Sequence, residues 1–108
     1  MWFFKPDFPT QLRVCLIARK FPLLGQANDY GFLWPVARGL ARAGHSVTVL
    51  SWRNPEHKVE FEQDGVRAIY LGETTNLPRE EFPMLVARKF TELHNHIPFH
   101  VVHSLDES

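Results

Sequence analysis

The chain has little cysteine and no excess of charge of either sign, and these absences exclude several classes of protein. Its 108 residues include one cysteine, Cys15, so no internal disulfide can form. A cysteine within an apolar run behaves as a small hydrophobic residue, and this usage favours a reducing compartment. The 12 lysines and arginines are balanced by 12 aspartates and glutamates. Because the basic excess that meets a phosphate backbone is absent, we expect no nucleic acid partner.

Long hydrophobic runs are also missing, since no apolar stretch is long enough to span a membrane as a helix. The N-terminus lacks the basic start and uninterrupted apolar stretch of a signal peptide, so we predict a cytoplasmic protein. Residues 1–12 contain four aromatic residues and two prolines. We interpret this segment as an extended tail whose aromatic side chains pack on the domain. The alternative is contact with a partner or with the inner face of a membrane, because clustered exposed aromatics mark interfaces.

The rest of the chain, residues 13–108, has the pattern of one small α/β domain. Residues 13–18 form a nearly continuous apolar run, which is typical of a strand covered on both faces of a parallel sheet. Apolar residues at helical spacing over 33–41 predict a helix that ends at Gly44. The β-branched segment 46–52 predicts the next strand. A strand, a helix and a strand in this order make a βαβ unit with a right-handed crossover.

A hairpin and a second helix complete the pattern. Residues 59–62 alternate apolar and charged side chains, Asp64-Gly65 is a turn signal, and 66–71 is the return strand. A helix over 79–96 and a short strand over 100–104 follow. The side chains that we expect this helix to bury are Phe82, Leu85, Val86, Phe90, Leu93 and Ile97. The order predicts a Rossmann-like fold, a mostly parallel sheet flanked by helices.

Two segments at the carboxyl ends of predicted strands are candidate ligand-binding positions. The loop at residues 21–29 precedes the first predicted helix, and backbone N–H groups beside a helix N-terminus can hold a phosphate. The glycines Gly25 and Gly31 lack the G-x-G-x-x-G spacing, so an ordinary connecting loop is the alternative. His103 lies where a histidine can exchange a hydrogen bond or a proton with a bound hydroxyl. The alternative to a binding role is that the backbone supplies the hydrogen-bond partner of the His103 ring. Asp106 follows on the same loop.

The histidine spacing does not suit a metal. His94 and His96 are two apart on a predicted helix and point in different directions. His100 and His103 are three apart on a strand and face opposite sides of it. No cysteine or carboxylate cluster completes either pair, so we expect no metal site. We interpret His45, at the end of the first predicted helix, as a structural cation that the helix dipole favours.

Several segments together resemble the opening of the family 4 retaining glycosyltransferases. They are Arg-Val-Cys-Leu-Ile at 13–17, Phe21-Pro22, Gly25, the helix–Gly-His–strand segment at 36–50, Asp64-Gly65-Val66 and Val-Val-His-Ser at 101–104. The resemblance covers residues 12–108. Its most specific part is the 36–50 segment, which related Rossmann proteins also carry. It implies that residues 13–108 are the incomplete N-terminal domain of a GT-B fold, in which two Rossmann-like domains face each other across a cleft.

The resemblance implies transfer of a hexosyl group from a nucleotide sugar to a hydroxyl acceptor, with retention of configuration and without a metal ion or other cofactor. In this family the N-terminal domain mostly binds the acceptor and the C-terminal domain binds the donor. The resemblance places Gly25 and Gln26 near the donor's phosphates and His103 near the transferred sugar, with Asp106 behind them. The chain departs from the family pattern at Gln26 in the glycine doublet and at Leu105, which replaces the second histidine of His-x-His. Because the donor domain is absent from these 108 residues, we expect no transfer by this chain alone.

Two other functions stay open on the sequence. One is a self-associating interaction module, because a sheet that ends at strand 100–104 has an open edge through which two copies can pair as a homodimer. The other is a free-standing nucleotide-binding domain, for which Glu56 is the nearest candidate for a ribose-binding acid after the second strand. We expect either that the natural protein continues beyond Ser108 or that this piece self-associates.

Overall fold

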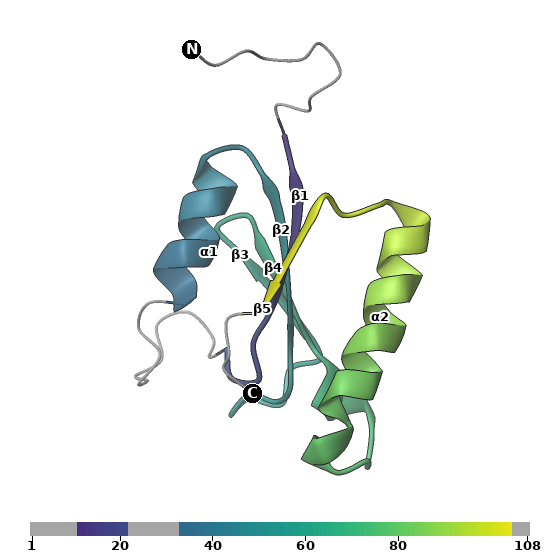
Figure 1. The fold of residues 1–108 in the computed structure, drawn as a ribbon. Helices are drawn as coiled ribbons and strands as arrows, with labels where there is room; N and C mark the ends of the chain where they lie inside the picture. Colours follow the sequence, from purple (N-terminus) through teal and green to yellow (C-terminus); the bar gives the residue numbers. More distant parts are fainter. Residues whose placement is uncertain (1–10, 22–32, 105–108) are drawn as a thin grey trace, which may run out of the picture.

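The computed structural model describes residues 11–21 and 33–104 of the chain. In these ranges, five strands form one sheet in the order β3-β4-β2-β1-β5, and the two helices lie on opposite faces of it (Figure 1). The elements are β1 (Arg13–Ile17), α1 (Leu33–Arg42), β2 (Ser46–Ser51), β3 (Glu60–Gln63), β4 (Val66–Tyr70), the short 3-10 helices η1 (Leu71–Thr74) and η2 (Arg79–Glu81), α2 (Phe82–His96) and β5 (Val101–Ser104). All neighbouring strands are parallel except β3 and β4, which form the expected hairpin. The mostly parallel α/β fold is confirmed and is compatible with a Rossmann-like sheet.

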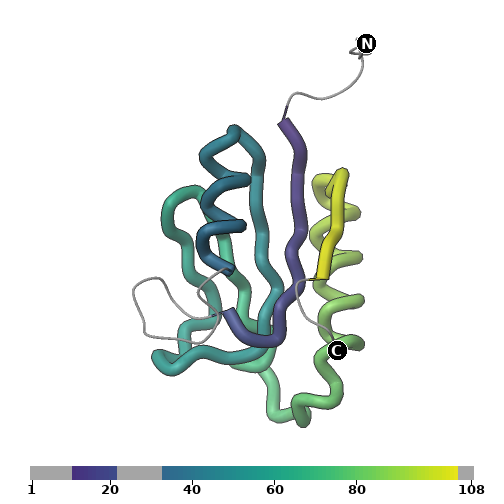
Figure 2. Tube along the Cα trace, turned by 60° about the vertical axis from the view of Figure 1, so that its left-hand side comes forward, coloured from purple at the N-terminus to yellow at the C-terminus, as the bar shows by residue number. Residues whose placement is uncertain are grey.

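β1 is an inner strand of the sheet and has a parallel neighbour on each side. It pairs in parallel with β2 on one edge and with β5 on the other (Figure 2). Its side chains alternate between the two faces, so Val14 and Leu16 pack in the cluster that includes α1, whereas Cys15 and Ile17 pack in the cluster that includes α2. Burial on both faces explains why the sequence of this strand is apolar at consecutive positions and not at alternate ones.

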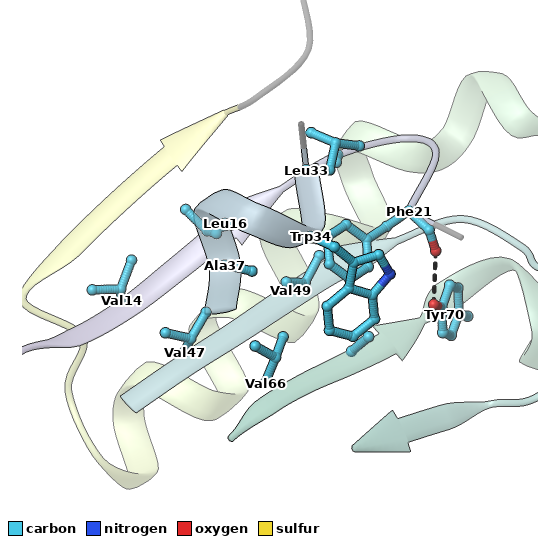
Figure 3. Packing of buried hydrophobic residues seen from close by; sticks show 12 residues of the cluster. Val14, Leu16, Phe21, Leu33, Trp34, Ala37, Val47, Val49, Val66 and Tyr70 are labelled. Atoms are coloured by element: carbon cyan, nitrogen blue, oxygen red, sulfur yellow. Dashed lines mark hydrogen bonds between the residues drawn. The ribbon is translucent and has the colours of Figure 1, made fainter. Parts of the chain in front are cut away.

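The core on the α1 face contains a side chain that helical spacing alone did not indicate. Trp34 is buried, and its ring lies 4.8 Å from that of Phe21 (Figure 3). The ring of Phe61 is 6.4 Å away. Val36, which belongs to the apolar pattern of the sequence, is exposed. The first turn of α1 therefore presents its indole to the sheet, where a larger apolar surface is buried than a valine could offer.

The core on the α2 face forms largely as the sequence pattern predicts. Phe82 and Val86 are buried against Cys15 and Leu50, and Leu85, Phe90 and Leu93 pack partly buried at the margin. The prediction is wrong for Ile97, whose side chain is 47% exposed. α2 ends at His96, and Ile97 has an extended backbone with φ −139° that turns its side chain out of the helical stripe.

Three histidines act as hydrogen-bond acceptors for the backbone. Nδ1 of His45 accepts the N–H of Leu12 at 3.0 Å, Nδ1 of His100 accepts the N–H of Arg13 at 2.8 Å, and Nδ1 of His94 accepts the N–H of Phe99 at 3.0 Å. These three rings hold backbone segments next to β1 and β5. The structural role expected of His45 is thus supported, since its ring holds the backbone of Leu12 beside the end of α1.

Gly72 and Gly39 provide a matched pair of glycine substitutions. A Cβ at Gly72 would lie 2.6 Å from Cδ2 of Trp52 and 2.8 Å from Cγ of Arg53, whereas a Cβ at Gly39 on α1 would meet nothing within 4 Å. We expect Gly72→Ala to lower the free energy of unfolding by about 1–3 kcal/mol through overpacking. Gly39→Ala should raise it by about 0.5–1 kcal/mol through helix propensity. Urea denaturation measures both, and a Gly72→Ala protein as stable as Gly39→Ala would contradict the packing described at Trp52.

Two buried acidic groups predict a loss of stability in alkali. Burial raises the pKa of the Cys15 thiol from 9.0 to about 12 and raises the pKa of the Tyr70 hydroxyl above its ordinary value of 10.0. Above pH 9 to 10 the unfolded chain releases protons that the folded chain retains, so stability is fully present below this range and falls as pH rises. Each group should remove about 1.4 kcal/mol per pH unit there.

Urea denaturation between about pH 8 and pH 11 measures this slope. The variant Cys15→Ala should show a shallower slope, because it lacks the thiol's contribution. An equal slope in both proteins would show that the thiol does not take part.

Candidate functional site

The carboxyl ends of β1 and β5 define the position where a ligand site is expected. The chain leaves β1 toward β2 through α1, whereas it passes from β4 across to β5 through α2, on the other side of β1 (Figure 2). β1 is therefore the point at which the strand order reverses. Open α/β sheets bind their ligands in the crevice that these diverging connections leave at the carboxyl ends of the strands.

The segment that follows β1 is fixed across the ends of β2 and β4. The N–H of Ala18 donates to the carbonyl of Leu50 at 3.1 Å. The carbonyl of Arg19 accepts the N–H of Trp52 at 3.3 Å and the hydroxyl of Ser51 at 3.2 Å. These bonds direct residues 18–21 toward β2, which lies on the side of β1 away from β5.

A buried hydrogen bond holds the end of this segment. The hydroxyl of Tyr70 donates to the carbonyl of Phe21 at 2.7 Å, and both residues belong to the α1-face core (Figure 3). A buried carbonyl without a partner would cost about 1–3 kcal/mol, so this bond fixes where the chain passes into the loop before α1.

The structure describes one of the four site residues predicted from the sequence. Gly25, Gln26 and Asp106 lie outside the described residues. His103 lies on β5 in register with Leu16, so its side chain is on the α1 face of the sheet, and it is exposed. Within residues 11–21 and 33–104, no hydrogen bond to the His103 ring is found. The alternative, in which the backbone satisfies the His103 ring, therefore has no support among the described residues. The ring of His100, by contrast, does bond to the backbone.

A pocket on the opposite face of the sheet lies between the end of β1 and the start of α2. It has a volume of about 310 Å³ and is lined by Ile17, Arg19, Phe82, Pro83 and Val86. The guanidinium of Arg19 lies over the ring of Phe82, 5.2 Å from its centre. Its lining comes from segments far apart in the sequence and is mostly apolar, so no local motif marks it.

The loop after β2 is organised by a buried asparagine. Oδ1 of Asn54 accepts the N–H groups of Glu56 at 3.0 Å and Lys58 at 3.1 Å, and its Nδ2 donates to the carbonyl of Lys58 at 2.7 Å. The N–H of Asn54 donates to Oε2 of Glu73 at 3.2 Å. These bonds hold the loop against η1, so the asparagine replaces the backbone partners that a regular strand would supply.

The buried carboxylate near this loop belongs to Glu73 and not to Glu56. The Glu73 side chain is 7% exposed, and its Oε1 lies 3.2 Å from Nδ1 of His57, whose side chain is 77% exposed. The Glu56 side chain is 54% exposed and lies 3.8 Å from the ammonium of Lys58. Glu73 therefore braces the loop through both of its carboxylate oxygens.

Further findings bear on the classes of protein considered. In residues 11–21 and 33–104, no group of three or more histidine, cysteine, aspartate or glutamate side chains could hold a metal ion. Over the same part of the chain, no helix has the length and apolar character needed to cross a membrane. Comparison with protein-family models, with curated proteins and with solved structures finds no match.

A substitution of Asn54 tests how the loop after β2 is held. Asn54→Ala removes the acceptor of two N–H groups and the donor to one carbonyl, so we expect the free energy of unfolding to fall by about 2 kcal/mol. Tryptic cleavage after Lys58 should also become faster, because the loop loses its fixed backbone. Asn76→Ala, at an exposed asparagine, should change neither. An Asn54→Ala protein with unchanged stability and cleavage would show that the loop is held by other contacts.

Proposed function

We propose that this chain is the front part of the N-terminal, acceptor-side domain of a nucleotide-sugar-dependent retaining glycosyltransferase of the GT-B kind. The observation that carries the proposal is the reversal of strand order at β1, with His103 on the parallel strand β5 beside it. This is the crevice in which α/β sheets bind ligands. The segments on which the family resemblance depends form α1, the turn at Gly44, β2, the hairpin turn and β5.

The exposure of β5 supports an incomplete domain. Val101 and Val102 are 41% and 49% exposed, and their register places them on opposite faces of the sheet. A strand of a parallel sheet is ordinarily covered on both faces. In the proposed parent enzyme, further elements of the same domain cover these valines, and a donor domain lies across the crevice.

The proposed roles follow from the family resemblance and, for His103, also from its place on β5. His103 donates or accepts a hydrogen bond at a hydroxyl of the bound sugar or acceptor. Gly25 and Gln26, in the loop before α1, approach the donor's phosphates, and Asp106 lies behind them. The nucleotide sugar and the hydroxyl acceptor are substrates, and the proposed reaction needs no cofactor. The proposed location is the cytoplasm, with the aromatic tail at residues 1–12 as the contact of a peripheral protein with the inner membrane face.

The exposed edge of β5 also favours a second candidate, a stand-alone module that self-associates. β5 has the sequence Val-Val-His-Ser, without the lysine or proline that commonly protects an edge strand. Pairing between two copies along this edge would extend the sheet through a homodimer.

The test begins with the intact mass of the product of the native gene. A mass well above 12.6 kDa supports the transferase. Sugar transfer by that full-length protein should then fall about ten-fold or more in His103→Ala, because a contact to the reacting sugar is lost. His96→Ala, at an exposed histidine on α2, should retain full turnover. Unchanged turnover in His103→Ala would remove this residue from the site.

A mass of 12.6 kDa would contradict the transferase proposal. Light scattering then decides for the second candidate, since a dimer supports self-association and a monomer at high concentration excludes it.

A further inference from the structure

The connection between β1 and α1 has both of its described ends in one buried cluster. Phe21 is the last described residue before this connection, and Leu33 is the first residue of α1 after it. The rings of Phe21 and Trp34 lie 4.8 Å apart, and Phe21, Leu33 and Trp34 are all buried in the α1-face core (Figure 3). The chain therefore leaves the sheet and enters α1 at two points that are packed against each other.

Tyr70 on β4 bonds to the first of these two ends. Its side chain is fully buried, and its hydroxyl donates to the carbonyl of Phe21 at 2.7 Å, across 49 positions of the sequence. Burial of a hydroxyl is costly unless it is hydrogen-bonded, and a phenylalanine would fill this place in the core without that cost. Packing alone therefore does not explain the hydroxyl, whereas its bond to Phe21 does.

The Tyr70 hydroxyl acts on a short stretch of backbone. The preceding residues, Ala18 and Arg19, are held by other hydrogen bonds, which they make with Leu50, Ser51 and Trp52 at the end of β2. None of these bonds involves Tyr70. Loss of its hydroxyl would therefore release the backbone at Phe21 and leave the earlier part of the segment in place.

We propose that Tyr70 is a positioning residue for binding of the nucleotide sugar and acts through the carbonyl of Phe21. The proposal rests on the transferase function proposed above, in which Gly25 and Gln26, shortly after Phe21 in the sequence, approach the donor's phosphates. A hydrogen bond at the start of the connection restricts the chain before the donor binds. Such preorganisation lowers the entropy cost of binding, so its loss weakens binding.

The test compares Tyr70→Phe with the original full-length protein in steady-state sugar transfer. The donor is the most active of three probes, UDP-glucose, GDP-mannose and ADP-glucose. We expect Tyr70→Phe to raise the KM for the donor about ten-fold. The kcat and the KM for the acceptor should stay within about two-fold, because the variant removes no group that touches the reacting atoms.

Val66→Ala is the matched control. Val66 lies on the same strand as Tyr70 and in the same cluster, and it is fully buried, but its side chain has no polar group. The variant should lower stability to urea at least as much as Tyr70→Phe, because it leaves a cavity. It should keep the original KM for the donor, so a change of KM in Tyr70→Phe alone reports on the hydrogen bond and not on stability.

Three results would overturn the proposal. An unchanged donor KM in Tyr70→Phe would show that the hydroxyl is only structural, and it would leave the transferase function intact. An equal rise of the donor KM in Val66→Ala would show that lost stability, and not the lost hydrogen bond, weakens binding. Absence of transfer by the original full-length protein with all three donors would instead contradict the transferase function, and the role of Tyr70 with it.

Discussion

The pairing of β1 on both edges and its burial on both faces determine where the other elements lie. The connection from β1 to β2 runs in one direction along the sheet, and the connection from β4 to β5 runs in the opposite direction. Right-handed crossovers in opposite directions place their helices on opposite faces, and α1 and α2 are arranged in this way (Figure 1). In open α/β sheets the same arrangement makes the carboxyl end of such a strand the expected ligand position. The fold and the position of the candidate site therefore have a single topological cause.

Residues 18–21 cross the carboxyl end of the sheet on the β2 side of β1 and leave the β5 side uncovered by this segment. The carbonyls of Arg19 and Phe21 accept hydrogen bonds from β2 and β4, so this segment covers the ends of those strands. The side chain of Arg19 lines the pocket at the end of β1. One residue thus fixes the backbone on one side of β1 and supplies a cation on the α2 face. A substitution that alters its side chain leaves its carbonyl hydrogen bonds in place.

Most of the fold could be predicted because its signals are local and repeated. The apolar run of β1 and the Asp64-Gly65 turn each depend on a few consecutive residues, and both are confirmed. The repeated helical spacing of α2 is confirmed except at Ile97. Ile97 was wrong because the spacing of a stripe does not show where the helix stops. Trp34 was missed because helical spacing does not show which apolar side chain of a turn is buried most deeply.

The site could be predicted less well, because its parts meet only in three dimensions. The strand that carries His103 is confirmed, because strand order can be read from the sequence, and the role of His103 stays a prediction. The pocket was not found, because Arg19 and Phe82 come from distant segments and neither is unusual in its own context. For Asn54 a signal did exist, because Asn54-Pro55 directly after a strand favours a turn that the asparagine side chain closes.

The exposure of β5 bears on whether the strand is covered by further layers of the same domain or only paired along its edge. Pairing of two copies along the open edge would satisfy the backbone N–H and C=O groups of β5, and these groups lie in the plane of the sheet. Val101 and Val102 point out of that plane to opposite faces, so edge pairing alone would leave much of both side chains in water. A larger domain, with layers on both faces, would bury both valines and gain about 25 cal/mol for each Å² of apolar surface covered. The two exposed valines therefore favour a larger domain, with further layers over both faces of β5, over a module that pairs only through its edge.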